Sequence, residues 1–270
     1  MMKRALAMML TLCLLLGGLA YAANAEDVAP LAYQEKPEEV VLAFAQALSK
    51  ADLNGILALS AASRLAPNMD MAAFIERLRT LVPFSENNVP SGDYPAYAPI
   101  LTLRLDAALA QQVQSLIMSL LVPSLMDEPT PKALVEGKLP LAGGEGITPE
   151  ELVARLDPVG LDSLRVHTVL RWVGDETTLE AYLRNSERVA ELHRGVYQED
   201  AELVIVYALG NQLYAGAGWL LRFPEGWLLR ALNAPTTGTP AGGASRLLTQ
   251  DDLQGLVEDA RYEILYRSDE

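Results

Sequence analysis

Apolar residues recur every three or four positions in the first half of the chain, a spacing typical of amphipathic helices. The first helix is predicted to begin at Pro37, because proline fits the first turn and the following Glu38 and Glu39 favour the positive helix end. Asp52 and Asp70 are predicted to cap the next two helices. The predicted helices cover about residues 37–48, 53–59, 71–82, 106–122 and 150–156.

From Leu164 the apolar period changes to two, which predicts a half-buried strand that ends at Trp172. One face of this strand would carry Leu164, Val166, Thr168, Leu170 and Trp172. Another helix is predicted over residues 178–193. Three strands should follow at 203–209, 213–223 and 227–232, joined by turns at Gly210-Asn211 and Pro224-Glu225-Gly226. Such short turns predict an antiparallel meander.

The Gly210-Asn211 turn fixes the register of the first hairpin. Pairing Leu209 with Gln212 places Tyr207 opposite Tyr214. The two faces then differ in polarity. The more apolar face is predicted to lie against the helices and carries Val204, Val206, Leu213, Ala215, Ala217, Trp219, Leu221, Phe223, Trp227 and Leu229. The other face mixes Tyr207, Tyr214, Arg222 and Arg230 with Gly216 and Gly218.

The expected fold class is therefore α+β. N-terminal helices would pack on a curved antiparallel sheet formed mainly by the C-terminal meander, with a helical insertion in the middle. A single domain is predicted over residues 26–233, with the insertion at about 66–157. A Thr/Pro/Gly tract predicts a linker over 234–248. Residues 249–270 should form a C-terminal helix and tail, because Thr249 and Asp252 fit a capping box.

The first 25 residues have the order of a secretory signal peptide. Lys3 and Arg4 precede an apolar run over residues 5–16, and Ala23-Asn24-Ala25 fits a cleavage site after Ala25. The run is shorter than the roughly 20 residues that span a bilayer, so no transmembrane helix is expected in the mature chain. The protein is predicted to be secreted or otherwise extracytoplasmic.

The composition of the chain excludes several kinds of binding and catalysis. The net charge of −14 predicts that the chain does not bind nucleic acid. Cys13, the one cysteine, lies in the signal segment, so disulfides and thiol catalysis are excluded in the mature chain. His167 and His193 are the two histidines and lack metal-ligand spacing. We therefore expect no metal and no cofactor.

Two segments resemble the NTF2-like (SnoaL-like, cystatin-type cone) superfamily. Residues 37–48 with Ala51-Asp52-Leu53 look like the first helix of the family and the acid that starts its second. Gly226-Trp227-Leu228-Leu229 resembles its closing strand. The resemblance implies a curved sheet around helices with an apolar pocket, in a family that includes isomerases, dehydratases and catalytically silent proteins. No catalytic residue of the family aligns with this chain.

The ligand-binding candidates are tyrosines, arginines and a histidine grouped on neighbouring strands: Tyr207, Tyr214, Arg222, Arg230, His167 and Arg171. Tyrosines and arginines on one face suit a planar or anionic ligand. The expected function is a non-catalytic domain that binds a small molecule or a protein, with a homodimer through a sheet face as one form. An NTF2-like pocket enzyme, an isomerase or lyase acting on a small apolar substrate with Tyr207, Tyr214 and His167, is the alternative. An assembly protein of the cell envelope is a third hypothesis.

Overall fold

The computed structural model describes residues 30–70, 72–73, 97–122, 148–155, 158–233 and 245–268. Residues 32–270 belong to one compact unit. The signal segment, nearly all of the predicted helix at 71–82 and the first part of the predicted linker lie outside the described residues. Within the described part, no helix is long and apolar enough to cross a membrane.

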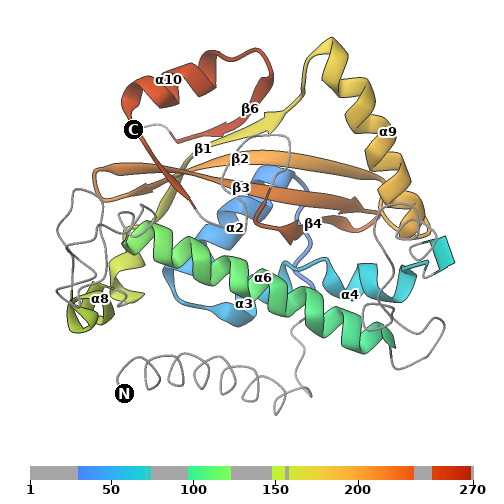
Figure 1. Ribbon diagram of the computed structural model, residues 1–270, viewed down its shortest axis with the longest axis horizontal. Helices are drawn as coiled ribbons and strands as arrows, with labels where there is room; N and C mark the ends of the chain where they lie inside the picture. The colour runs from blue at the N-terminus through green and yellow to red at the C-terminus, as the bar shows by residue number, and fades with distance from the viewer. Residues whose placement is uncertain are drawn as a thin grey trace, which may run out of the picture. The chain divides into compact units, whose positions relative to one another are not determined.

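A six-stranded antiparallel sheet forms the centre of the unit (Figure 1). Its main path runs in the order β4-β3-β2-β1-β6, and the short β5 pairs with β3. The strands are β1 (Arg165–Trp172), β2 (Glu199–Leu209), β3 (Gln212–Phe223), β4 (Gly226–Ala231), β5 (Arg246–Leu248) and β6 (Tyr262–Arg267). Helices precede or flank this sheet, so the predicted α+β class is confirmed.

The predicted hairpin register is confirmed. Leu209 pairs with Gln212, and Tyr207 lies opposite Tyr214. Gly210 adopts a φ of +57°, a conformation that glycine reaches without a steric penalty. The meander of β2, β3 and β4 is therefore a consequence of local turn chemistry.

The helices lie before the sheet and between its strands. They are α2 (Pro37–Ser49), α3 (Leu53–Ala58), α4 (Ala62–Leu65), α6 (Tyr97–Leu121), α8 (Pro149–Arg155), α9 (Glu176–Leu192) and α10 (Gln250–Glu258), with 3-10 turns at Ala66–Asn68 and Pro158–Leu161. The predicted start of α6 at Asp106 is wrong by about two and a half turns. The helix begins at Tyr97, and Pro99 falls in its first turn, where a missing N–H costs nothing.

The predicted choice of sheet face is wrong. Helices α2, α3 and α6 pack on the face that carries Leu203, Ile205, Tyr207 and Tyr214, and together they form the main core. The helical partners in that core are Val40, Val41, Phe44, Ala45, Leu48, Ile56, Leu109, Val113, Leu116 and Leu120. Trp227 and Leu229 also belong to it. In the sequence this face looked more polar because it carries tyrosines and glycines. In the structure the tyrosine rings are fully buried.

The opposite face carries a smaller core under α10. Leu170, Val204, Val206 and Ala215 pack there with Leu248 of β5 and Leu253 of α10. In Figure 1 the strands run between α6 and α10. The predicted capping box is confirmed, since Thr249 Oγ1 accepts from the Asp252 N–H at 3.1 Å. Strands β5 and β6 were missed by the sequence, which predicted the end of a linker and a tail there.

A bulge breaks the predicted alternation of β1. The register shifts between Val166 and Thr168, so His167 is the extra residue. Val166 and Val169 consequently share the main core, although strict alternation would separate them. Nearly every position of β1 is buried, because helices cover both faces of the sheet.

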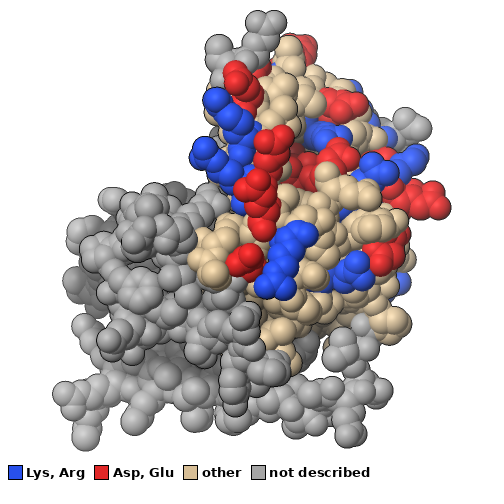
Figure 2. Space-filling view, turned by 90° about the vertical axis from the view of Figure 1, so that its right-hand side faces the viewer, with Lys and Arg blue, Asp and Glu red and all other residues tan. Residues whose placement is uncertain are grey.

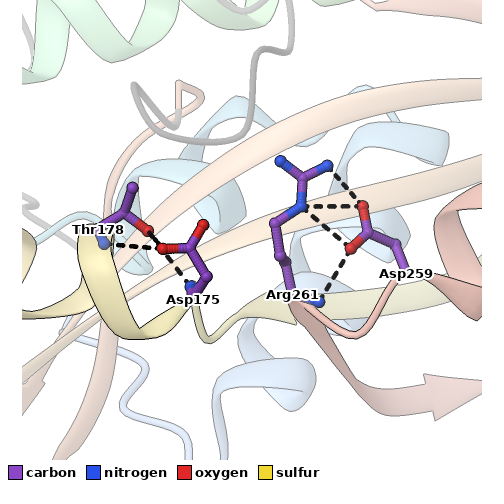
Figure 3. A network of polar contacts seen from close by, with 4 residues as sticks. All are labelled: Asp175, Thr178, Asp259 and Arg261. Carbon is purple, nitrogen blue, oxygen red and sulfur yellow. Dashed lines mark hydrogen bonds and ion pairs between the residues drawn. The ribbon is translucent and has the colours of Figure 1, made fainter.

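Helix α9 begins beside the start of β6 (Figure 3). Asp175 caps it, with Oδ1 accepting the Thr178 N–H at 2.8 Å. On the adjoining chain, Arg261 donates through Nη2 to Asp259 Oδ2 at 2.6 Å, and the Val173 N–H donates to the Arg261 carbonyl at 2.8 Å. The beginning of α9 is thus fixed next to the sheet edge formed by β6.

Candidate functional site

A cavity of about 190 Å³ lies where α4 and α6 meet the end of β4 and Trp219 of β3. Its wall consists of Ala62, Leu65, Leu105, Ala108, Leu109, Gln112, Trp219, Arg230, Ala231 and Asn233. We call it the Arg230 cavity. Among the described residues of this wall, Arg230 is the one that carries a charge, in a chain whose net charge is −14. Its charge is opposite in sign to the net charge of the protein.

A β-bulge positions Arg230. Leu229 pairs with Leu220 and Ala231 pairs with Trp219, so Arg230 has no partner residue in β3. A bulge of this kind redirects the side chain of the extra residue. The guanidinium carbon of Arg230 consequently lies 3.8 Å from the centroid of the Trp219 ring, a cation–π arrangement.

The guanidinium of Arg230 has no counter-ion in the described part of the chain. No carboxylate there lies within 4.0 Å of it, and its Nη1 is buried without a hydrogen-bond partner. Burial lowers the pKa of Arg230, while Tyr197 and Asp200 act in the opposite direction. Arginine nevertheless stays protonated in proteins. The cavity wall therefore holds a partly desolvated positive charge, and an anion would compensate it.

Asp200 holds the Trp219 ring. The indole Nε1 donates to Asp200 Oδ2 at 3.2 Å, and Ser186 Oγ of α9 donates to Oδ1 of the same carboxylate at 2.6 Å. Tyr182 of α9 also contacts Asp200 and packs edge-on against Trp172, with ring centroids 4.8 Å apart. Contacts with β2 and α9 therefore hold the Trp219 ring in place beneath the guanidinium of Arg230.

His193 and Tyr197 lie near Arg230, just after the end of α9. His193 Nδ1 is 3.3 Å from the Leu65 carbonyl, which fits an N–H that donates to it. Burial, reinforced by the charge of Arg230, lowers the pKa of His193 to about 4. The ring is therefore neutral at pH 7. Burial also raises the pKa of Tyr197 to about 12, and the Tyr197 hydroxyl is buried without a partner among the described residues.

Two polar side chains complete the wall. Gln112 Oε1 accepts the Leu232 N–H at 2.7 Å, which ties α6 to the end of β4. Asn233 Oδ1 is buried and has no hydrogen-bond partner in the described part of the chain. A polar ligand group at this end of the cavity would therefore find an unfilled acceptor nearby.

Of the six predicted ligand-binding residues, Arg230 alone lines this cavity. Tyr207 and Tyr214 lie in the main core, where burial raises the pKa of both hydroxyls. The Tyr214 hydroxyl donates to Gln212 Oε1 at 2.6 Å, whereas the Tyr207 hydroxyl is buried without a partner. The ligand role of these tyrosines stays a prediction.

The remaining candidates contact other protein groups. Arg171 and Arg222 both form ion pairs with Glu199, one to each carboxylate oxygen. His167 is buried in the β1 bulge, with Nδ1 2.7 Å from Thr168 Oγ1. The structure thus brings Arg171 and Arg222 together at Glu199 and places Arg230 elsewhere.

Sequence reasoning missed Trp219, Asp200 and Gln112. A signal for Asp200 was present, because the strand period places Asp200 and Glu202 on the same face as the buried Val204 and Val206. A carboxylate at a position that the strand period makes buried calls for a partner or a function. The described residues contain no cluster of three or more side chains suited to a metal ion.

Comparison with known proteins adds little about the family or the function of this chain. No family model matches the chain, and no curated protein matches it. A solved structure of a cystatin-like protein from Ruminococcus gnavus ATCC 29149 is similar at 19% sequence identity and a TM-score of 0.41. The match covers 78% of this chain, which spans 44% of the length of that protein. The resemblance to the NTF2-like superfamily therefore remains a prediction.

Proposed function

We propose that this protein is an extracytoplasmic, non-catalytic binding module that holds a small anionic ligand in the Arg230 cavity. The single observation that carries the proposal is the guanidinium on the cavity wall, for which no carboxylate among the described residues serves as counter-ion. A half-buried cation without a counter-ion costs folding free energy that a bound anion would offset. Anion binding accounts for its presence.

The rigid support of Arg230 agrees with a binding role. Trp219 holds the guanidinium from one side, and Asp200 fixes Trp219 through a partly buried hydrogen bond. Pre-organisation of this kind lowers the entropy lost when a ligand binds. Catalysis is not required by this arrangement, and none of Tyr207, Tyr214 and His167 lines the cavity.

The extracytoplasmic location rests on the sequence. Lys3, Arg4, the apolar run at 5–16 and Ala23-Asn24-Ala25 follow the order of a signal peptide. Mass spectrometry of the protein recovered from its host should find Glu26 as the first residue. An intact or acylated amino terminus would argue against export by this route.

Thermal unfolding with a panel of anions tests the binding role. The panel contains benzoate, hexanoate, phosphate, sulfate and chloride, applied to the wild type, to Arg230→Met and to Arg188→Met. Arg188 is exposed on α9, so its variant removes the same charge away from the cavity. A ligand present at 100 times its Kd stabilises the folded state by about 2.7 kcal/mol.

At least one anion is expected to raise the Tm of the wild type and of Arg188→Met, but not that of Arg230→Met. Equal shifts in all three proteins, or no shift in any of them, would contradict the proposal. Each protein is first checked for an unchanged far-ultraviolet circular dichroism spectrum, so a folding defect is not mistaken for lost binding.

A further inference from the structure

The residues of the cavity wall restrict the chemical class of the ligand. We infer that the Arg230 cavity takes a small apolar monocarboxylate, with its carboxylate at Arg230 and its hydrocarbon body against the leucines of α4 and α6. This inference rests on the proposed function, since it names the chemical class of the ligand held by the same cavity.

Leucines form the apolar side of the cavity. Leu65 comes from α4, and Leu105 and Leu109 come from adjacent turns of α6. The buried Ala62 and the exposed Ala108 also line the cavity, and their short side chains fill little of its space. A hydrocarbon group placed there would remove apolar surface from water, which contributes about 25 cal/mol for each Å² buried.

The volume limits the body of the ligand. Pockets for drug-sized ligands occupy roughly 300–1,000 Å³, whereas this cavity measures about 190 Å³. An engineered apolar cavity of about 150 Å³ accommodates benzene. The Arg230 cavity therefore suits one six-membered ring, or a short alkyl chain, together with a carboxylate. A fused bicyclic acid would extend beyond this volume.

The charge of the wall selects one negative charge. Arg230 supplies a single cation, and no acidic residue is found among the described residues that line the cavity. Stacking on Trp219 occupies the face of the guanidinium, while its N–H groups lie along the edge, where a carboxylate can accept two parallel hydrogen bonds. A second carboxylate or a dianionic phosphate would carry a charge that no described residue of this wall compensates.

The acidic neighbour Asp200 does not compete for this role. Its two oxygens accept hydrogen bonds from Ser186 and Trp219, and it lies outside the cavity wall. Asp200 still favours the charged form of Arg230 from a distance. It therefore supports the cation without neutralising it by direct contact.

Isothermal titration calorimetry with matched probes tests the inference. The probes are benzoate and hexanoate, the neutral benzyl alcohol, the dicarboxylate phthalate, the bicyclic 2-naphthoate, and inorganic phosphate. Benzoate and hexanoate should bind the wild type, and each of the other four should bind at least tenfold more weakly. Arg230→Met should weaken benzoate binding by roughly ten- to a hundredfold, the range expected for hydrogen bonds to a charged group, and leave benzyl alcohol unchanged.

Further variants distinguish a specific loss of binding from misfolding of the protein. Ala62→Leu fills the cavity from α4 and should abolish benzoate binding while keeping Arg230 in place. Arg230→Lys keeps the charge but loses the planar fork, so it should retain weakened benzoate binding. Arg188→Met should bind benzoate like the wild type.

The outcomes separate the two proposals. Tighter binding of phosphate, phthalate or 2-naphthoate than of benzoate, lost in Arg230→Met, overturns the inferred ligand class and leaves the anion-binding function standing. Benzoate binding that survives both Arg230→Met and Ala62→Leu places the ligand elsewhere and overturns the inference. Absence of any Arg230-dependent anion binding overturns both proposals.

Discussion

The guanidinium of Arg230 lies on the Trp219 ring, 3.8 Å from its centroid, and no carboxylate of the described chain pairs with it. Trp219 is in turn held by Asp200 through its indole N–H. This arrangement places one positive charge on a cavity wall whose other described residues are uncharged. The positive charge favours the interpretation of the Arg230 cavity as a ligand site over its interpretation as a gap in side-chain packing.

Arg230→Met is expected to stabilise the ligand-free protein by about 1 kcal/mol, because it removes an unpaired cation and keeps an unbranched chain against Trp219. The lost cation–π contact limits the gain. Urea unfolding monitored by circular dichroism measures the change, with Arg188→Met as the exposed control. Destabilisation by more than about 1 kcal/mol would show instead that Arg230 is a structural residue.

Asp200→Ala should destabilise the protein by about 2–4 kcal/mol, since it leaves the Ser186 hydroxyl and the Trp219 N–H without their acceptor. It should also weaken benzoate binding, because the Trp219 ring under Arg230 would no longer be held by Asp200. Chemical unfolding and titration calorimetry measure the two effects. Asp162→Ala, at an exposed position, should stay within about 0.5 kcal/mol of the wild type. Equal stability of the two variants would show that Asp200 does not hold the ring.

Gly216→Ala should destabilise the main core by about 1–3 kcal/mol. A Cβ at Gly216 would lie 2.9 Å from Cε2 of Tyr207, whose ring is fully buried and has no room to move aside. Gly255→Ala is the matched control, because nothing lies within 4 Å of its Cβ and the helix α10 gains propensity. Thermal unfolding should therefore show opposite signs for the two variants. A neutral Gly216→Ala would contradict the packing of Tyr207 across β3.

His193 predicts a specific pH dependence of stability. Its pKa in the folded state is about 4, below the ordinary value of 6.5, so between these values the unfolded chain binds more protons than the folded one. Stability contributed by the neutral ring is thus complete above pH 6.5 and is lost as pH falls towards 4. The loss should be on the order of 3 kcal/mol, and His193→Gln should lack it. Unfolding free energies measured in urea at several pH values test this. Parallel pH profiles for the two proteins would contradict the burial of His193 next to Arg230.

The parts of the fold that depend on local signals were predictable from the sequence. Gly210-Asn211 determined the hairpin register, and Thr249 with Asp252 marked the start of α10. The face of the sheet was not predictable by the same reasoning. Helices cover both faces, so the apolar count of each face did not reveal which one receives α2 and α6.

The candidate site depended on non-local features. Arg230 reaches the cavity because of a bulge opposite Trp219 and Leu220, and bulges leave no clear trace in a single strand. Leu65, Leu105 and Leu109 look like ordinary core residues until α4 and α6 are placed beside β4. The sequence identified Arg230 as a ligand-binding candidate, but it grouped Arg230 with residues that lie elsewhere.

The central claim is that Arg230 and the leucines of α4 and α6 hold one small acid in solution. Nuclear Overhauser effects between benzoate and a methyl-labelled sample of the protein test it most directly. We predict contacts from the ring protons of benzoate to the methyl groups of Leu65, Leu105 and Leu109, and their disappearance in Arg230→Met. Contacts to methyl groups outside the cavity, or none at saturating benzoate, would contradict the account.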